Sequence, residues 1–188
     1  MLNVGDIKPS EYLTEFFLDM AWDINLSGCK SGSGVVFSHL GNWLNQTFGK
    51  KTGKELLPLM KDFYLLSHIR KPEFMGNTRT YDKRHEQIAD LPWSTEEINE
   101  RLEQFKKLSD RVEKLYATVP SNRKDAYFEM IQYPVQASNE MNKKMLYAQF
   151  ARHTPSDSAS LWKKSDAAYD SIVSLTRRFN SLLDGKWN

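Results

Sequence analysis

The sequence predicts an all-α fold, an antiparallel bundle of about five long helices. Hydrophobic residues recur at spacings of three and four along most of the 188 residues, which is the spacing of one helix face. Capping patterns and helix-ending Gly or Pro residues separate these segments. The connections between the last three helices are short, and such connections favour antiparallel neighbours.

The first helix is expected over residues 10–22, with Ser10 as its N-cap. A Gly/Ser-rich loop, "SGCKSGSG" at 27–34, precedes a second helix over 35–48, which Gly49 ends. The expected inward residues are Leu13, Phe16, Phe17 and Met20 in the first helix and Val36, Leu40, Trp43 and Leu44 in the second.

A third helix is expected to begin at a capping box, in which Glu55 answers Thr52, and to end before Pro72. Pro58 lies in its second turn and is expected to bend it. Its expected inward residues are Leu56, Leu59, Met60, Phe63, Leu66 and Ile69. Residues 72–93 have the least regular pattern, which predicts a long ordered loop with a short helical piece near 81–89.

The clearest helix follows a second capping box, "STEE" at 94–97, and continues to about residue 117. Its expected buried face is Ile98, Leu102, Phe105, Leu108, Val112 and Leu115. On the opposite face we expect i,i+4 ion pairs, each of which contributes only about 0.2–0.5 kcal/mol. These pairs are Glu97–Arg101, Glu103–Lys107 and Asp110–Lys114.

Ser121 is expected to cap a helix that continues across Pro134 with a kink, because the hydrophobic stripe keeps its phase on both sides of the proline. "HTPS" at 153–156 ends this helix. The last helix is expected over 157–183, with Gly185 as its terminator. Its wide apolar face comprises Leu161, Trp162, Ala168, Ile172, Leu175, Phe179 and Leu182.

Composition excludes several classes of function. A net charge of +2 gives no reason to expect a nucleic acid or an anionic membrane as partner. No apolar run approaches the roughly 18 residues of a membrane-spanning helix. Cys29 is the only cysteine, so neither an intrachain disulfide nor a cysteine zinc site can form. The four histidines, His39, His68, His85 and His153, lack metal-binding spacing, and we expect no metal, no cofactor and no catalytic machinery in the helices.

The opening segment "NVGDIKP", residues 3–9, has a different pattern. It indicates the end of a strand followed by a tight turn, and a strand needs partners for its backbone groups. In a β/α barrel, substrate-contacting residues lie at this end of the strands, so Asn3, Asp6 and Lys8 are candidate substrate-binding residues. Alternatively, the three side chains satisfy hydrogen bonds of the turn and the helix start.

Four blocks of the sequence carry a family resemblance: "NVGDIKPSEYLTEFFLDMAWD", "IRKPEFMG", "YPVQASNEMNKKMLYAQ" and "GKWN". Their order and spacing resemble glycoside hydrolase family 115, the xylan α-glucuronidases, over nearly the whole chain. The resemblance implies a catalytic β/α barrel, then a helical bundle, then a β-rich domain. Residues 1–9 would then be the remnant of the last strand region of the barrel, and residues 10–188 the helical bundle domain.

The resemblance also implies a function. The family removes glucuronic acid, or its 4-O-methyl ether, from xylan side chains with inversion, by means of carboxyl groups on the barrel. Those groups lie upstream of this segment, so we expect no catalytic residue here and an inactive isolated chain. Asn3 matches a sugar-binding asparagine of the family, and Asp6 and Lys8 belong to the same motif. Relatives that act outside the cytoplasm imply a secreted or periplasmic parent.

The expected partners are glucuronoxylan or a related glycan, bound through the barrel, and the flanking barrel and β-rich domains. Apolar area left by those domains predicts self-association. The loop at 72–93, with Arg79, Tyr81, Lys83 and Trp93, either forms a rim of the active site or packs between domains. The chain departs from the family pattern at "SGCKSGSG" and at Asn77, where the family has Trp. The alternative is an independent helical interaction module without carbohydrate chemistry.

Overall fold

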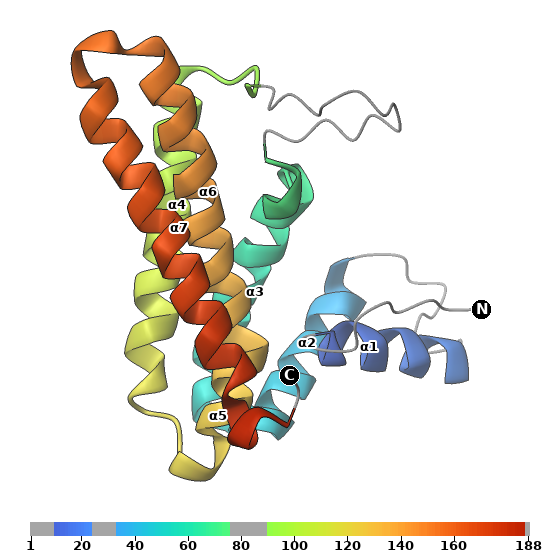
Figure 1. Cartoon of the computed structure of the whole chain (residues 1–188). Helices are drawn as coiled ribbons and strands as arrows, with labels where there is room; N and C mark the ends of the chain where they lie inside the picture. Colours follow the sequence, from blue (N-terminus) through green and yellow to red (C-terminus); the bar gives the residue numbers. More distant parts are fainter. Residues whose placement is uncertain (1–9, 24–32, 76–89, 187–188) are drawn as a thin grey trace, which may run out of the picture. The chain divides into compact units, whose positions relative to one another are not determined.

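The computed structural model describes residues 10–23, 33–75 and 90–186, and these residues contain helices and no strand (Figure 1). This confirms the all-α prediction. The α-helices are α1 (Glu11–Trp22), α2 (Ser33–Phe48), α3 (Lys50–Ile69), α4 (Thr95–Tyr116), α5 (Lys124–Tyr127), α6 (Tyr133–His153) and α7 (Ser158–Asn180). The shorter turns are η1 (Pro72–Phe74), η2 (Ser121–Arg123), the π-helical η3 (Phe128–Gln132), η4 (Pro155–Asp157) and η5 (Leu182–Gly185).

The chain forms two compact units, to each of which α3 and α4 contribute. The first comprises Met1–Asp62 and Arg111–Pro134, and the second Phe63–Asp110 and Val135–Asn188. Every described helix is too short or too polar to cross a lipid bilayer.

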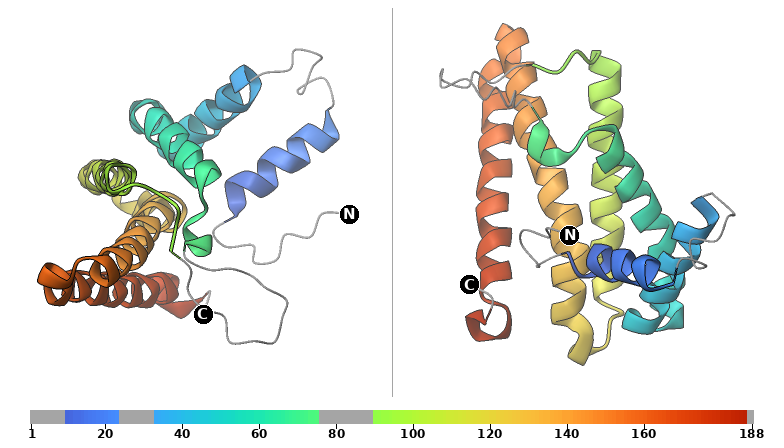
Figure 2. Two further views of the ribbon diagram at one scale, coloured as in Figure 1. Left: turned by 90° about the horizontal axis from the view of Figure 1, so that it is seen from above. Right: turned by 90° about the vertical axis from the view of Figure 1, so that its right-hand side faces the viewer.

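In the second unit, α6 lies between α7 and α4 (Figures 1 and 2). The contacts between α6 and α7 show that these two helices are antiparallel. Lys164 of α7 lies 5.4 Å from the ring of Tyr147, whereas Tyr169, further along α7, is contacted by the earlier residue Lys144 at 5.1 Å. The Ser165 hydroxyl donates to the Lys144 carbonyl at 2.7 Å. The predicted antiparallel arrangement is therefore present in this unit.

A chain of aromatic contacts forms the core of the first unit. Tyr12 of α1 lies 5.1 Å from Trp43 of α2, and Trp43 lies 6.2 Å from Phe48. Phe48 in turn contacts Tyr127 at 5.6 Å in an edge-to-face geometry, which aromatic pairs favour. The Tyr127 hydroxyl is buried and donates to the carbonyl of Val112 at 2.8 Å. Burial, with a smaller effect of nearby glutamates, raises the pKa of Tyr127, so it remains a neutral donor.

The core of the second unit joins both ends of the long connection between α3 and α4. The buried cluster comprises Met75, Leu91, Ile98 and Leu146, with Trp93, Leu102, Met145 and Phe150 packed against it. Met75 and Leu91 flank the connection, whereas Ile98 and Leu146 belong to α4 and α6. Burial of apolar surface contributes about 25 cal/mol per Å². It therefore stabilises the packing of both ends of the connection against α4 and α6.

Several local predictions are confirmed. The Ser94 amide donates to Glu97 Oε2 at 2.7 Å and the Glu97 amide to Ser94 Oγ at 3.2 Å, so the predicted capping box begins α4. Gly49 has φ +87° and Gly185 φ +77°, the left-handed conformation that favours glycine at helix ends. The helical conformation continues across Pro134 after the π-helical turn η3, a turn that accommodates disruption of the regular helical hydrogen bonds.

The inward face of α1 is displaced by one residue from the prediction. Leu13 is 54% and Phe17 47% exposed, whereas Tyr12 is 8% exposed. The cause is the contact with α2, in which Tyr12, Phe16 and Asp19 face that helix. Ring contacts and a hydrogen bond to α2 residues determine which face of α1 is buried, and hydrophobicity alone does not. The Ser10 side chain makes no capping hydrogen bond. In other helices, the expected inward residues Val36, Ile69 and Trp162 are exposed.

The start of α3 also differs from the prediction. The helix begins at Lys50, so Thr52 is inside its first turn and is not an N-cap. A Cβ on Gly53 would lie 2.7 Å from the Asn45 amide nitrogen. This close approach of the α2 and α3 backbones, which only glycine permits, sets the register of the tight α2–α3 connection. At the other end of α2, Ser33 and Gly34 are helical rather than part of the predicted loop.

The predicted ion pairs of α4 are partly wrong. Glu103 and Lys107 do pair, at 3.4 Å, but Asp110 pairs with Lys106 at 2.5 Å in place of Lys114. Arg101 does not lie on the exposed face beside Glu97, because it is 5% exposed and bonds to other helices. The helical piece predicted near 81–89 lies outside the described residues.

We expect Gly53→Ala to destabilise the chain by about 1–3 kcal/mol, the range for overpacking a filled site. The added methyl group would meet the backbone of Asn45, which cannot move as a side-chain end would, and this outweighs the helix propensity gained. Urea denaturation measures the effect. Gly34→Ala is the matched control, because nothing lies within 4 Å of the added Cβ, and its stability should be unchanged or slightly higher. Equal stability of the two variants would contradict the close approach.

Candidate functional site

The three substrate-binding candidates from the sequence, Asn3, Asp6 and Lys8, lie outside the described residues. The same holds for Arg79, Tyr81 and Lys83 of the predicted rim loop. Trp93, the fourth residue singled out in that loop, is described and packs against the core of the second unit. The Trp93 ring contacts the guanidinium of Arg101, a buried charged group.

Arg101 ties three helices together through hydrogen bonds. Its Nε donates to Asn142 Oδ1 of α6 at 2.6 Å, its Nη1 to the Leu66 carbonyl at 3.2 Å and its Nη2 to the Arg70 carbonyl at 2.7 Å. Leu66 is in the last turn of α3, and its carbonyl also accepts from the Arg70 amide at 3.2 Å. Arg70 directly follows the helix, where backbone carbonyls have no further turn of helix to bond to. Asn142 is held in turn, since its Nδ2 donates to the Ser138 carbonyl at 2.7 Å. Arg101 therefore caps α3 and links it to α4 and α6.

Two aromatic rings contact the same guanidinium. The Arg101 Cζ lies 5.2 Å from the ring centroid of Trp93 and 4.9 Å from that of Phe105, distances at which a cation is attracted to the ring face. Burial, and to a lesser extent the charge of Arg70, lowers the pKa of Arg101 to about 10, so the group stays charged at neutral pH. No carboxylate of the described residues forms an ion pair with it. A buried cation is normally paired with a carboxylate.

A pocket of about 230 Å³ lies beside Arg101. It is lined by the apolar residues Leu66, Ile69 and Trp93, the cation Arg101, and Glu97, Glu100 and Gln104 of α4. The pocket thus combines apolar walls, a charged donor and several acceptors on one side of α4. Such a combination of apolar surface with a few polar groups is typical of small-molecule sites.

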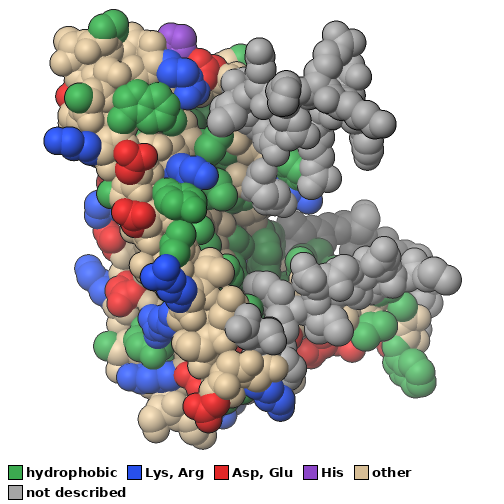
Figure 3. All heavy atoms as spheres, in the orientation of Figure 1, with side chains coloured by type: hydrophobic (Ala, Val, Ile, Leu, Met, Phe, Trp, Pro, Cys, Tyr) green, Lys and Arg blue, Asp and Glu red, His purple; other side chains and the backbone are tan. Residues whose placement is uncertain are grey.

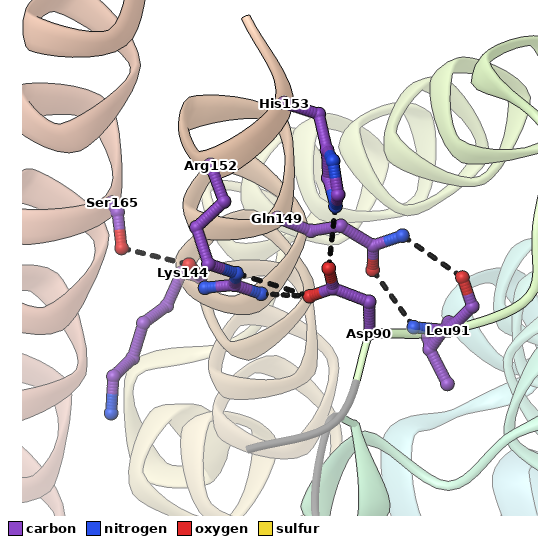
Figure 4. Close-up of polar contacts among 7 residues, drawn as sticks. All are labelled: Asp90, Leu91, Lys144, Gln149, Arg152, His153 and Ser165. Carbon is purple, nitrogen blue, oxygen red and sulfur yellow. Dashed lines mark hydrogen bonds and ion pairs between the residues drawn. The ribbon is translucent and has the colours of Figure 1, made fainter. Parts of the chain in front are cut away.

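A second polar group joins the C-terminal end of α6 to residues 90 and 91 (Figure 4). Gln149 Oε1 accepts from the Leu91 amide at 3.0 Å and Gln149 Nε2 donates to the Leu91 carbonyl at 2.9 Å. Asp90 accepts from Arg152 Nε at 3.1 Å and contacts His153 Nε2 at 2.6 Å. The hydrogen bonds from Arg152 are the main cause that lowers the pKa of the Asp90 carboxyl. This arrangement anchors the chain where it enters α4.

The histidines and acids do not form a metal site in the described structure. His39 Nε2 lies 3.0 Å from Asp19 Oδ2, and His153 contacts Asp90 as above. Within residues 10–23, 33–75 and 90–186, no three His, Cys, Asp or Glu side chains converge closely enough to hold a metal ion.

Sequence reasoning missed both polar groups, although one signal was present. Arg101 follows Ile98 by three positions and precedes Phe105 by four, so it lies on the buried stripe of α4 rather than on the charged face. A charged residue at a position of the buried hydrophobic stripe indicates a buried polar contact. Asp90 had no comparable signal, because its partners Arg152 and His153 are distant in sequence.

Comparison with known proteins gives two matches. The model of glycosyl hydrolase family 115 matches residues 1–74. A solved structure of a family GH115 4-O-methyl-alpha-glucuronidase with specificity for decorated arabinogalactans is 52% identical, with a TM-score of 0.88 over 100% of this chain. The chain covers 24% of that enzyme. No curated protein matches.

We expect Asp90→Asn to lower the free energy of unfolding at pH 7 by about 0.5–1 kcal/mol, the range for a partly exposed ion pair. The folded-state pKa of Asp90 is below its ordinary value of 3.8. The carboxylate therefore contributes its stabilisation above that value and loses it as the pH falls through the folded-state pKa. Urea denaturation at pH 7 and pH 3 should show a difference from the parent chain that shrinks in acid.

Asp166→Asn is the control for this experiment, because Asp166 is an exposed residue of α7. Its effect should be close to zero at both pH values. A difference for Asp90→Asn that is the same at pH 7 and in acid would contradict the role assigned to the carboxylate charge.

Proposed function

This chain belongs to glycoside hydrolase family 115, and on that premise we propose that it is the helical domain of an α-glucuronidase. The observation that carries this proposal is the 52% identity, over the full length of the chain, to a 4-O-methyl-alpha-glucuronidase. The chain spans 24% of that enzyme, so the activity proposed here is that of a longer protein. The helical domain itself supplies no catalytic residue in this proposal.

The proposed substrate is a glycan that carries glucuronic acid or its 4-O-methyl ether as a side group. The family resemblance favours glucuronoxylan, whereas the solved relative is specific for decorated arabinogalactans. Both polysaccharides present the same sugar acid to the enzyme. The terminal uronic acid therefore defines the proposed substrate, and activity on each of the two polysaccharides identifies the backbone.

The N-terminal segment is proposed to belong to the substrate site. Residues 1–9 would complete the last strand region of a β/α barrel, with Asn3 as a substrate contact and Asp6 and Lys8 beside it. The family model matches residues 1–74 as one region. This match supports treating the N-terminal segment and the helices that follow it as parts of the same family sequence. In a barrel, the ends of strands carry the groups that touch the substrate.

The outer surface of α1 supports a role in contacts between domains. Four large apolar side chains of this helix are exposed: Leu13 at 54%, Phe17 at 47%, Leu18 at 55% and Trp22 at 92%. Figure 3 shows hydrophobic side chains at the surface over α1. Exposed apolar surface is a feature of interaction sites, and all four residues lie in the segment that the family model matches. We propose that this α1 face packs on the barrel of the same enzyme.

The enzyme encoded by the whole reading frame should release glucuronic acid, or its 4-O-methyl ether, from glucuronoxylan or decorated arabinogalactan. Asn3→Ala in that enzyme should lower kcat/KM by at least about 100-fold, because one well-placed hydrogen bond to a reacting sugar is worth several kcal/mol in the transition state. Asn180→Ala, at the end of α7, is the control and should retain activity. If the enzyme releases the sugar acid from neither glycan, the proposal is contradicted.

Phe17→Ser with Trp22→Ser should reduce self-association of the isolated chain at high concentration, because the exposed α1 face is then less apolar. Sedimentation velocity measures the change, and the thermal midpoint should hardly move, since both side chains are exposed. Tyr169→Ser on α7 is the matched control, with a side chain that is also exposed but lies outside the matched segment. Equal self-association of all three proteins would argue against the α1 face as an interface.

A further inference from the structure

We propose that the pocket beside Arg101 is a binding site for a uronic acid residue, with the sugar carboxylate on the Arg101 guanidinium. The site lies wholly within the second unit. It is formed by the C-terminal end of α3, the first turns of α4 and Trp93. The choice of a sugar acid among carboxylates rests on the function proposed above, whereas the carboxylate itself follows from the residues of the pocket.

The Arg101 guanidinium has hydrogen-bond donors that the described residues leave without an acceptor. A guanidinium has five N–H groups, and the described residues accept three of them, through Asn142, Leu66 and Arg70. Two N–H groups therefore have no acceptor among the described residues. A carboxylate accepts from such N–H groups with both oxygens.

The charge of the buried guanidinium also favours an anion in the pocket. Arg101 is 5% exposed, and a cation at that depth without a counter-ion is costly. The glutamates of the pocket, Glu97 and Glu100, do not offset this charge in the same way, because both are exposed and their fields are screened by water and salt. Glu97 is also engaged with the Ser94 amide, and Glu100 with Gln104 at 3.1 Å. An anion at the guanidinium would be attracted strongly by the buried charge of Arg101 and repelled only weakly by the exposed charges of Glu97 and Glu100.

The remaining lining of the pocket matches the other groups of a sugar acid. A sugar acid presents one carboxylate, a ring face of C–H groups and several hydroxyls. The pocket offers the corresponding partners: a guanidinium, the apolar walls of Leu66, Ile69 and Trp93, and the acceptors Glu97, Glu100 and Gln104. A simple anion would use only the first of these, and a neutral sugar would leave the guanidinium unpaired. The accessible volume of about 230 Å³ suits a single monosaccharide unit rather than a chain of them.

The test is a titration of the ¹⁵N-labelled full chain, followed by NMR at the Trp93 indole N–H and the Arg101 Nε–H. The probes are sodium D-glucuronate, D-glucose and sodium acetate at matched ionic strength. Glucuronate should shift both signals with an affinity at least about tenfold higher than that of either other probe. No shift with glucuronate, or equal affinity for all three compounds, would overturn the proposal.

Variants separate charge from shape. Arg101→Lys keeps the cation but loses the planar fork, and it should weaken glucuronate binding at least about tenfold. Arg111→Lys on the same helix, whose side chain is exposed, should bind as the parent chain does. Because Arg101→Lys also disturbs the α3 end, circular dichroism must show that it is folded.

Glu100→Gln tests the site without touching the buried network. Removal of a rim carboxylate should raise glucuronate affinity two- to fivefold if an anion occupies the pocket. An unchanged or lower affinity would overturn the assignment of an anionic ligand. The binding experiment and the assay of the whole enzyme can fail independently: loss of the first leaves the glucuronidase activity in place, and loss of the second leaves a carboxylate site on a chain of another function.

Discussion

The second unit is organised around the requirement that a buried guanidinium must find acceptors. Arg101 meets three-fifths of this requirement, through backbone carbonyls at the end of α3 and an amide oxygen of α6, while Trp93 and Phe105 lie at cation–π distance. The carbonyls at a helix C-terminus carry partial negative charge, so the cation and the helix end stabilise one another. This single side chain fixes where α3 ends relative to α4 and α6.

The first unit is built differently. It depends on a row of rings from Tyr12 to Tyr127, in which the Tyr12–Trp43 pair is tilted and the Trp43–Phe48 and Phe48–Tyr127 pairs are edge-to-face. The Trp43 indole donates to Glu15 Oε2 at 2.9 Å and His39 contacts Asp19. These bonds orient α1 on α2, so that one face of α1 is used internally and its opposite, apolar face is left at the surface.

These two constructions suit the proposed place of the chain in a larger glycoside hydrolase. The second unit can carry a ligand pocket, because three hydrogen bonds hold Arg101 and because Trp93 packs against the buried cluster. An apolar helix face in the segment matched by the family model suits contact with a further domain. The polar anchor of Asp90 and Leu91 on α6 gives residues 90–93 a defined position next to the pocket, and the Trp93 side chain forms one of its walls.

The sequence alone determined the helices, most of their ends and the family. Periodic hydrophobic residues, the Ser94–Glu97 capping box and Gly49 are local signals, since their partners lie within a few positions. Tertiary structure decided which side of α1 is buried, why α3 begins at Lys50 and that Arg101 is internal. Each of these depends on residues distant along the chain: rings of α2 for Tyr12, the Asn45 backbone for Gly53, and Leu66, Arg70 and Asn142 for Arg101. Hydrophobic periodicity identifies which face of a helix is buried, but it does not identify the helix against which that face packs. The packing of α3, α4 and Trp93 forms the pocket beside Arg101.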